Sequence, residues 1–289
     1  MIPVVAVVAP GNMGAAVARR LTEHGLKVIT TLAGRGDASV ARAAAAGMTD
    51  VPFDRLTGAQ IVLSILPPAH ALSFAEEMAP LLLAAQRKPV FVDCNAVSPQ
   101  TARQIGAVVA ATGAPFIDAS IIGLAPKAGQ PSPHFYASGG SAARLEVLGQ
   151  YGLDVRVLDG PVGAASALKM SYAGINKGLA AIAAAMILAA SRSGATEALY
   201  REMSESLPGL LISLRRQIPD MLPKAYRWVA EMREIAEFAG EDAATQAVFV
   251  GFSELFARIS RDVAGEQRES AVLTGFFQKP GVNEVPNVL

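Results

Sequence analysis

The feature that most constrains the fold is a β-branched run from Ile2 to Val8 that ends in a glycine turn. An unbroken apolar run of this length is typical of a strand buried on both faces of a parallel sheet. A helical pattern follows up to Gly25, and Lys27 begins a second β-branched run, so the segment has the order strand–turn–helix–strand. The turn matches the pattern G-x-G-x-x-G with alanine as its first residue. In such a unit the helix N-terminus faces the phosphates of a dinucleotide. The predicted cofactor contacts in this loop are Ala9, Gly11, Asn12, Met13 and Gly14.

The same alternation of strands and helices continues to about residue 160. It predicts a doubly wound α/β sheet of the Rossmann type over residues 1–160. Strand signals nearly vanish after that point, which predicts an all-α domain over residues 161–289. The expected later strands are 60–66, 89–93, 115–118, 135–137 and 154–158, and the expected helices are 38–46, 69–85, 99–112, 164–192, 197–217, 223–239 and 243–263. The last twenty residues show no convincing pattern.

Composition narrows the class of protein. Twenty-five basic side chains balance twenty-five acidic ones, which favours neither nucleic acid nor an anionic membrane as a partner. The single cysteine, Cys94, excludes an intrachain disulfide, and the apolar N-terminus has no basic leader, so we expect a cytoplasmic protein. His24, His70 and His134 do not have metal-ligand spacing, so no metal is expected.

One apolar run, Leu179 to Ala190, predicts a partner subunit. It is shorter than the roughly 18 residues of a membrane span. A helix that is apolar on all sides is buried in a core or between subunits. A helical domain of about 125 residues can hide such a helix only in part, which favours a homodimer formed through the helical half.

The end of the second strand bears on the choice of cofactor. No acidic residue stands there before Asp37, and Arg35 lies in a Gly-Arg-Gly turn. A carboxylate at this place binds the ribose 2′-hydroxyl of NAD, whereas arginine suits a 2′-phosphate. The pattern therefore favours NADP, with NAD possible. The alternative is a solvated surface arginine.

Two further segments carry candidate chemistry. Gly160 to Lys169 is a glycine-punctuated turn that opens the long helix, and Lys169 stands early in an otherwise apolar segment. Apolar surroundings disfavour the cationic form of a lysine and make the amine a usable base. The alternative is a lysine that reaches solvent from a buried helix. Asp118 to Gly123 follows a predicted strand end, where ligands bind in open α/β sheets. The alternative there is a polar loop that caps the sheet.

Together these motifs resemble the β-hydroxyacid dehydrogenase superfamily, which includes 3-hydroxyisobutyrate and 6-phosphogluconate dehydrogenases. Ser64-Ile-Leu-Pro67 resembles its post-strand L-P segment, and Asp93 to Pro99 resembles its D-x-S-T-x-x-P segment. Asp118 to Gly123 resembles its D-A-P-V-S-G substrate loop, and Gly160 to Lys169 its catalytic-lysine segment. The resemblance implies hydride transfer between a nicotinamide and a small β-hydroxy acid, with Lys169 as the general acid/base. It also implies cofactor contacts at Leu66, Pro67 and Asn95, and substrate contacts at Ser120, Ile122 and Gly123.

The sequence departs from the family after the lysine. The usual pattern is K-x-x-[NH]-N, whereas this chain has Tyr172 and Ala173 at the polar positions. Asn176, one turn further along, lies where 6-phosphogluconate dehydrogenases carry an acid, so it joins Tyr172 as a candidate catalytic residue. By the same resemblance, the segments that contain Trp228 and Arg233 stand where relatives place substrate-facing residues.

Two alternative functions remain open. An imine reductase shares the architecture: Lys169 counts against it and Tyr172 supports it. A catalytically silent dinucleotide-binding protein is suggested by the missing asparagine. Apolar side chains near the site favour an acid less polar than a sugar phosphate; these are Ile121, Ile122, Tyr172 and Trp228.

Overall fold

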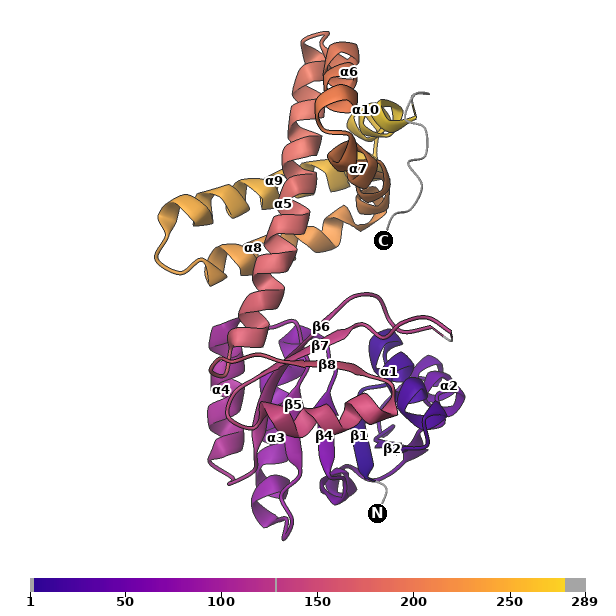
Figure 1. The fold of residues 1–289 in the computed structure, drawn as a ribbon, viewed down its shortest axis with the longest axis vertical. Coiled ribbons are helices and arrows are strands. Elements are labelled where there is room, and N and C mark those ends of the chain that lie inside the picture. Colours follow the sequence, from indigo (N-terminus) through magenta and orange to yellow (C-terminus); the bar gives the residue numbers. More distant parts are fainter. Residues whose placement is uncertain (1–2, 128, 279–289) are drawn as a thin grey trace. The chain divides into compact units, whose positions relative to one another are not determined.

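In the computed structural model, which describes residues 3–127 and 129–278, eight strands form one sheet (Figure 1). Their order is β3-β2-β1-β4-β5-β6-β7-β8. The strands from β1 to β6 pair in parallel, β7 is antiparallel to β6, and β8 is parallel to β7. The first six strands thus form a doubly wound parallel sheet, as the sequence predicts, although β3 was not among the expected strands. The strands are β1 (Val4–Val8), β2 (Lys27–Thr30), β3 (Thr49–Asp50), β4 (Ile61–Ser64), β5 (Val90–Asp93), β6 (Phe116–Ile122), β7 (His134–Ser138) and β8 (Asp154–Val157).

Apolar side chains cover both faces of this sheet, as the unbroken run in β1 predicts. Val5 and Val7 pack in one cluster, and Ala6 and Val8 in a second cluster on the opposite face. The first face is covered by α1 (Asn12–Glu23), α2 (Asp37–Ala45) and the 3-10 segment η3 (Ala142–Tyr151). The second face is covered by α3 (Ala71–Ala84) and α4 (Pro99–Ala110). Two short 3-10 turns, η1 (Phe53–Gly58) and η2 (Pro68–His70), precede α3 in the chain.

Strand β6 is longer than predicted. The sequence ends this strand at Asp118, whereas the structure continues it to Ile122. The added residues pair with β7, from Asp118 opposite Ser138 to Ile122 opposite His134. The expectation of a loop at residues 118–123 was therefore wrong. The pairing strand lies more than ten residues further along the chain, so no local pattern reveals it.

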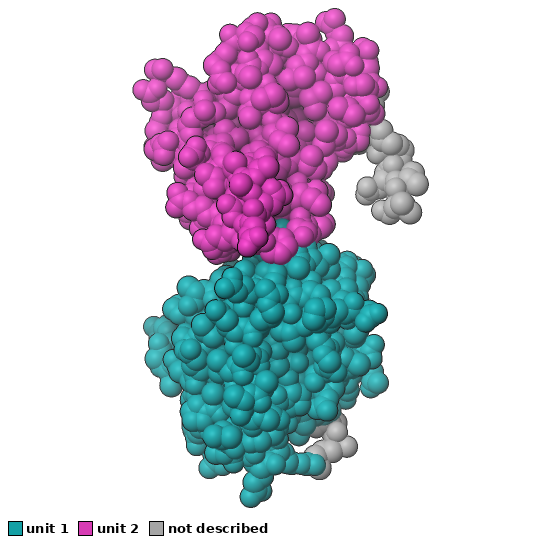
Figure 2. All heavy atoms as spheres, turned by 90° about the vertical axis from the view of Figure 1, so that its left-hand side faces the viewer, with its two compact units in different colours: residues 1–170 teal, residues 171–289 magenta. Residues whose placement is uncertain are grey.

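Contacts divide the chain into residues 1–170 and 171–289 (Figure 2). The sequence places the boundary at residue 160. The difference lies in the first turns of α5 (Ala164–Arg192), which are hydrogen-bonded to the sheet: the backbone N–H groups of Ala165 and Ser166 donate to side chains of β7 and β6. The bounds of α5 itself agree with the predicted helix.

The second unit contains only helices among its described residues. They are α6 (Thr196–Ser206), α7 (Pro208–Met221), the 3-10 turn η4 (Leu222–Lys224), α8 (Ala225–Phe238), α9 (Ala243–Ala264) and α10 (Arg268–Phe277). The predicted helix 197–217 is two helices, since Pro208 disfavours helical backbone at the residue before it. Helix α10 was not predicted. Its N-terminus is capped by Asp262 of α9, whose carboxylate accepts from the N–H groups of Glu269 and Ser270.

Helix α5 packs closely in this unit and also exposes an apolar face. A Cβ atom at Gly174 would lie 3.1 Å from Phe249, and one at Gly178 would lie 3.3 Å from Phe252, so the two glycines let α9 approach. By length and composition α5 is able to cross a membrane, but the core helix of a soluble protein meets the same criterion. Five large apolar residues of α5 are between 43% and 67% exposed; we call this set the apolar stripe, and its members are Tyr172, Ile175, Leu179, Ile182 and Met186.

Candidate cofactor and catalytic site

The loop after β1 has room for a ligand and a fixed shape. Gly11 is the N-cap of α1, and a Cβ atom there would meet nothing within 4 Å. A Cβ atom at Gly14 would lie 2.1 Å from the carbonyl oxygen of Ala9, so only glycine fits. Asn12 and Met13 begin the helix, and the first N–H groups of any helix lack partners within it. These groups form a site suited to an anion such as a pyrophosphate.

Three residues that follow β2 in the chain bear on cofactor binding. The sequence pattern singles out Arg35 but neither Thr31 nor Arg42. Arg35 is exposed in the turn between β2 and α2. The buried hydroxyl of Thr31 has no hydrogen-bond partner within the described part of the chain. Arg42 of α2 donates from Nε to the carbonyl oxygen of Pro10 at 2.9 Å, which brings a second guanidinium to the cofactor loop. The sequence pattern gave no signal for Arg42 beyond its place in a predicted helix.

Asn95 joins the ends of β4 and β5. Its Oδ1 accepts from the N–H of Leu66 at 2.5 Å, and its Nδ2 donates to Ser64 Oγ at 2.9 Å and to a carboxylate oxygen of Asp93. These bonds fix the segment that leads from β4 into Leu66 and Pro67. The polar atoms of Asn95 are thus engaged within the protein, and its contact with the cofactor stays a prediction.

Four polar side chains lie in register across four neighbouring strands, and we call them the buried polar row. Ser64 of β4 pairs with Asp93 of β5, Asp93 with Asp118 of β6, and Asp118 with Ser138 of β7. All four residues are fully buried. The sequence motifs contain both aspartates, but pairing between strands far apart in the chain cannot be read from them.

Asp118 holds the beginning of α5. Its carboxylate accepts from the N–H of Gly163 at 2.9 Å, the N–H of Ser166 at 3.2 Å and Ser166 Oγ at 2.7 Å. Ser138 Oγ also donates to it at 2.9 Å and accepts from the N–H of Ala165 at 3.0 Å. A carboxylate at the N-terminus of a helix is favoured by the helix dipole. Gly163 has φ +102, a conformation that favours glycine, and it lies against Pro99 of α4.

Lys169 follows this anchored turn and is half-buried. Burial lowers its pKa, and the negative charges that Cys94 and Asp93 would carry oppose the shift. Burial also raises the pKa of the Cys94 thiol well above its usual range, so that group is uncharged near neutral pH. Asp93 is therefore the anion that acts on Lys169. An amine with a lowered pKa is suited to taking up and returning a proton.

The predicted substrate segment lies on β6. Ser120 is fully buried, and its hydroxyl has no hydrogen-bond partner among the residues that the structure describes. Because side chains alternate along a strand, Ser120 and the half-buried Ile122 share a face with Asp118. Gly123 follows with φ +130, and a Cβ atom there would lie 3.0 Å from Pro133.

The remaining predicted residues lie in the second unit. Tyr172 is exposed and Asn176 is half-buried, both on α5. On α8, Arg233 is exposed, and Trp228 packs edge to face on Phe256 with ring centroids 5.1 Å apart. Trp228 therefore also contributes to the packing of the helical unit.

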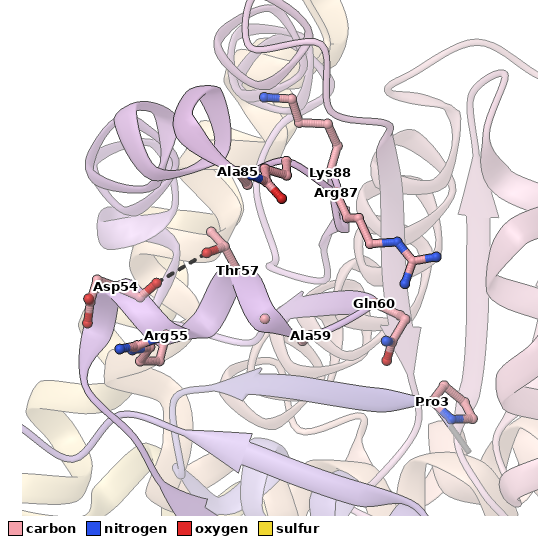
Figure 3. Close-up of a pocket in the computed structure, with 11 residues that line it drawn as sticks. Pro3, Asp54, Arg55, Thr57, Ala59, Gln60, Ala85, Arg87 and Lys88 are labelled. Carbon is pink, nitrogen blue, oxygen red and sulfur yellow. Dashed lines mark hydrogen bonds between the residues drawn. The ribbon is translucent and has the colours of Figure 1, made fainter. Parts of the chain in front are cut away.

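A surface hollow of about 860 Å³ is not part of this site (Figure 3). Its lining includes Pro3, Gln60 and Lys88, which precede β1, β4 and β5 in sequence. The hollow thus lies at the amino ends of the strands, whereas ligands of open α/β sheets bind at the carboxyl ends.

The parallel sheet, the glycine turn and the polar groups at its carboxyl edge define an NAD(P)-binding Rossmann-type unit followed by a helical unit. Residues 4–150 match the NAD-binding domain of 6-phosphogluconate dehydrogenase, and the chain belongs to this family. Residues 190–259 match a domain of unknown function, DUF1932. The divergent helical half inferred from the sequence agrees with this second match.

Two curated relatives match part of the chain. The 3-hydroxyisobutyrate dehydrogenase of Pseudomonas aeruginosa is 31% identical over 115 residues, which are 39% of this chain and 38% of that protein. An uncharacterized protein of Methanothermus fervidus is 29% identical over 153 residues, which are 53% of this chain and 57% of the relative. The chain therefore spans only about half the length of the curated relatives it matches.

Solved structures share the fold over nearly the whole chain. A conserved protein of unknown function, described as structurally similar to 3-hydroxyacid dehydrogenases, has a TM-score of 0.77 at 26% identity, with 90% of this chain and 98% of that chain covered. The 3-hydroxyisobutyrate dehydrogenase of Mycobacterium tuberculosis, solved with L-serine, has a TM-score of 0.70 at 20% identity and covers 95% and 99%. An imine reductase variant of Myxococcus stipitatus, in complex with NAD+, has a TM-score of 0.60 at 18% identity and covers 96% and 100%.

Proposed function

We propose that this chain transfers a hydride between a nicotinamide cofactor and a small β-hydroxy acid, with Lys169 as the general acid/base. The observation that carries the proposal is the environment of Lys169. Burial lowers the pKa of its amine, and its helix is anchored by Asp118 at the carboxyl edge of a sheet whose family binds NAD. We expect NADP to be preferred to NAD because Arg35 follows β2, Arg42 contacts the loop after β1, and no acidic residue ends β2.

The residues around the β1 turn fit a dinucleotide. The open space at Gly11 and the unpartnered Thr31 hydroxyl support this fit. The N–H groups at the start of α1 would hold the pyrophosphate, together with the turn from Ala9, and the Leu66–Pro67 segment would flank the nicotinamide. Arg35 would contact a 2′-phosphate. When bound, the nicotinamide accepts or donates the hydride at its C4 atom.

The protein's own share of the reaction is to orient the substrate and move a proton. In oxidation the neutral Lys169 amine accepts the hydroxyl proton, and in reduction the ammonium returns it. The unpartnered hydroxyl of Ser120 and the backbone at Gly123 would hold the substrate carboxylate. Further substrate contacts from Ile122, Asn176, Trp228 and Arg233 follow from the family resemblance. Tyr172, one turn after the lysine, is the second candidate proton donor.

Two alternative functions each have an observation in their favour. Tyr172, one helical turn after Lys169, favours an imine reductase, whose fold this chain shares. The missing asparagine after the lysine favours a silent dinucleotide-binding protein. A screen of small β-hydroxy acids and cyclic imines with NADP and NAD distinguishes the proposed function from these two alternatives. Turnover of a hydroxy acid supports the proposal, and turnover of imines alone supports the second reading. Cofactor binding without any turnover supports the third.

We also propose that the chain forms a homodimer through the apolar stripe of α5. The members of the stripe are spaced alternately three and four residues apart, which is the pattern by which helices pair along a seam. Half-exposed side chains of this size offer roughly 100 Å² each, so the stripe supplies about 500 Å² of the ~800 Å² that each partner of a stable interface buries. The balanced charge and the buried free thiol of Cys94 support a cytoplasmic protein that binds neither nucleic acid nor membrane.

A further inference from the structure

The order of the strands gives the direction in which a bound dinucleotide runs across the sheet. Strand β1 lies between β2 and β4, and the anion site at the start of α1 follows β1. In such units the pyrophosphate lies at the helix N-terminus and the ribose of the adenosine half lies at the end of the second strand. The nicotinamide half therefore extends to the opposite side, over residues 65–67, which we call the exit segment of β4.

On the side of β1, main-chain bonds hold the exit segment. The N–H of Ile65 donates to the carbonyl oxygen of Val8, and the N–H of Ala9 donates to the carbonyl oxygen of Ile65 at 3.2 Å. These two bonds continue the pairing of β1 and β4 past the ends of both strands. They fix Ile65 beside the cofactor loop, but they do not reach the next residue.

On the side of β5, one side chain holds the exit segment. The N–H of Leu66 donates to Oδ1 of Asn95 at 2.5 Å. The next two residues, Pro67 and Pro68, have no N–H to donate. The bond to Asn95 is therefore the last one that the main chain donates before the exposed Pro67, and it sets the direction in which the chain leaves the sheet.

Asn95 is itself fixed in one orientation. It is buried, and its Nδ2 donates to Ser64 Oγ at 2.9 Å and to a carboxylate oxygen of Asp93. Both N–H bonds of the amide are thus engaged. A flipped amide would place its N–H groups against the N–H of Leu66 and leave that donor without an acceptor, so Oδ1 stays on Leu66.

We propose that Asn95 is a positioning residue for the nicotinamide half of the cofactor, and that it acts through the N–H of Leu66 by holding Leu66 and Pro67 in place. This inference rests on the proposed function, which needs a nicotinamide bound at this edge of the sheet. The adenosine half lies on the other side of the β1 turn and does not depend on this bond. Loss of the Asn95 amide should thus weaken binding of the nicotinamide half alone.

The test compares two ligands that differ only in the nicotinamide: NADP, and 2′-phospho-ADP-ribose, which lacks it. Asn95→Ala removes the acceptor of the Leu66 N–H. Calorimetric titration of this variant should show an affinity for NADP lowered by about 3–10-fold, the size of effect that one lost hydrogen bond has, and an unchanged affinity for 2′-phospho-ADP-ribose. If the wild type binds NAD more tightly than NADP, NAD and ADP-ribose are the matching pair.

A second readout needs no cofactor. Hydrogen–deuterium exchange of the unliganded protein, followed in the peptide that contains Leu66, should be faster at this amide by about 3–10-fold in Asn95→Ala. Ser98→Ala is the matched control, since it removes the N-cap hydroxyl of α4 in the same connection between β5 and α4. It should lower the stability of the protein but leave both the exchange of Leu66 and the ratio of the two affinities unchanged.

Equal losses for the two ligands, or unchanged exchange at Leu66 in folded Asn95→Ala, overturn the inference, and so does a wild type that binds neither NADP nor NAD. If Asn95→Ala does not fold, Ser64→Ala decides by the same two readouts, because it removes one of the two acceptors that orient the amide. A selective loss of NADP in a protein that oxidises no hydroxy acid keeps the inference and rejects the proposed function. Equal losses in a protein that does oxidise a hydroxy acid reject the inference alone.

Discussion

At the scale of single residues, a substitution of Lys169 tests the proposed chemistry most directly. Lys169→Met keeps the bulk of the side chain but removes the titrating amine. The turnover rate should fall about 10²–10⁴-fold, the usual share of general acid/base catalysis, while cofactor affinity stays the same. The measurements are kcat on the substrate found in the screen and cofactor binding by fluorescence titration. If a folded Lys169→Met protein keeps wild-type turnover, the mechanism is wrong and Tyr172 becomes the favoured proton donor.

The same variant should change how stability depends on pH. Because the pKa of Lys169 is lowered in the folded state, the unfolded chain binds this proton more tightly. Wild-type stability therefore gains from rising pH between the lowered folded pKa and the unfolded value of about 10.4, and Lys169→Met loses that gain. Urea unfolding at several pH values measures the difference. A lysine whose amine reaches solvent would give the same slope in both proteins.

Arg35 allows a test of cofactor choice. Arg35→Ala should weaken binding of NADP by about 10–150-fold and leave NAD nearly unchanged, since a charge-assisted contact to phosphate contributes roughly 1.5–3 kcal/mol. Arg55→Ala, at the opposite end of the sheet, is the matched control. Calorimetric titration with both cofactors gives the comparison. Equal losses for NADP and NAD would remove Arg35 from the 2′-phosphate site and leave Arg42 as the arginine to vary.

The sequence predicted some of these residues better than others. Lys169 and the glycine turn stand in local motifs, so both could be singled out from the sequence, the lysine with the help of the family resemblance. The buried polar row was not predicted, because it depends on the register of strands that are 20 or more residues apart. Arg42 was missed for a similar reason: its contact is with the carbonyl of Pro10, on a different element.

At the scale of elements, the two glycines of the β1 turn should respond differently to alanine. At Gly14 the new Cβ atom meets the Ala9 carbonyl at 2.1 Å, so Gly14→Ala should destabilise the protein by about 1–3 kcal/mol even without cofactor. At Gly11 the space is open, so Gly11→Ala should cost less than about 1 kcal/mol while it weakens cofactor binding at least about tenfold. Thermal unfolding and cofactor titration of both variants measure this. Undiminished cofactor affinity in Gly11→Ala would place the pyrophosphate elsewhere.

Local patterns predicted elements well where apolar periodicity alone decides them. The bounds of α5 and the strands of the parallel sheet, except for the two-residue β3, are of this kind. The end of β6 and the whole of α10 depend on distant partners: β7 extends the former, and Asp262 of α9 caps the latter. These two elements were accordingly mispredicted.

At the scale of the whole molecule, the apolar stripe makes assembly testable. Ile182→Glu places a charge at the middle of the stripe, where the side chain is half exposed. It should change monomer stability by no more than about 0.5 kcal/mol, yet prevent pairing of two copies, because a charge would be buried unpaired. Light scattering at micromolar concentration should show a dimer for the wild type and a monomer for the variant. Leu83→Glu, at an exposed apolar position on α3, is the control that should remain dimeric. A monomeric wild type contradicts the proposal.

The anchoring of α5 has a consequence for how such proteins diversify. Asp118 and Lys169 both precede residue 171, so the proposed general acid/base and the anchor of its helix lie in the unit that contains the match to the NAD-binding domain. The helical half is then free to drift, to be exchanged, or to acquire new side chains toward a substrate without disturbing the acid/base machinery. We therefore expect related proteins to keep the lysine and the aspartate that anchors its helix, while their substrates differ. Joining the helical half of a relative after residue 170 is therefore a way to change the substrate while keeping the proposed general acid/base.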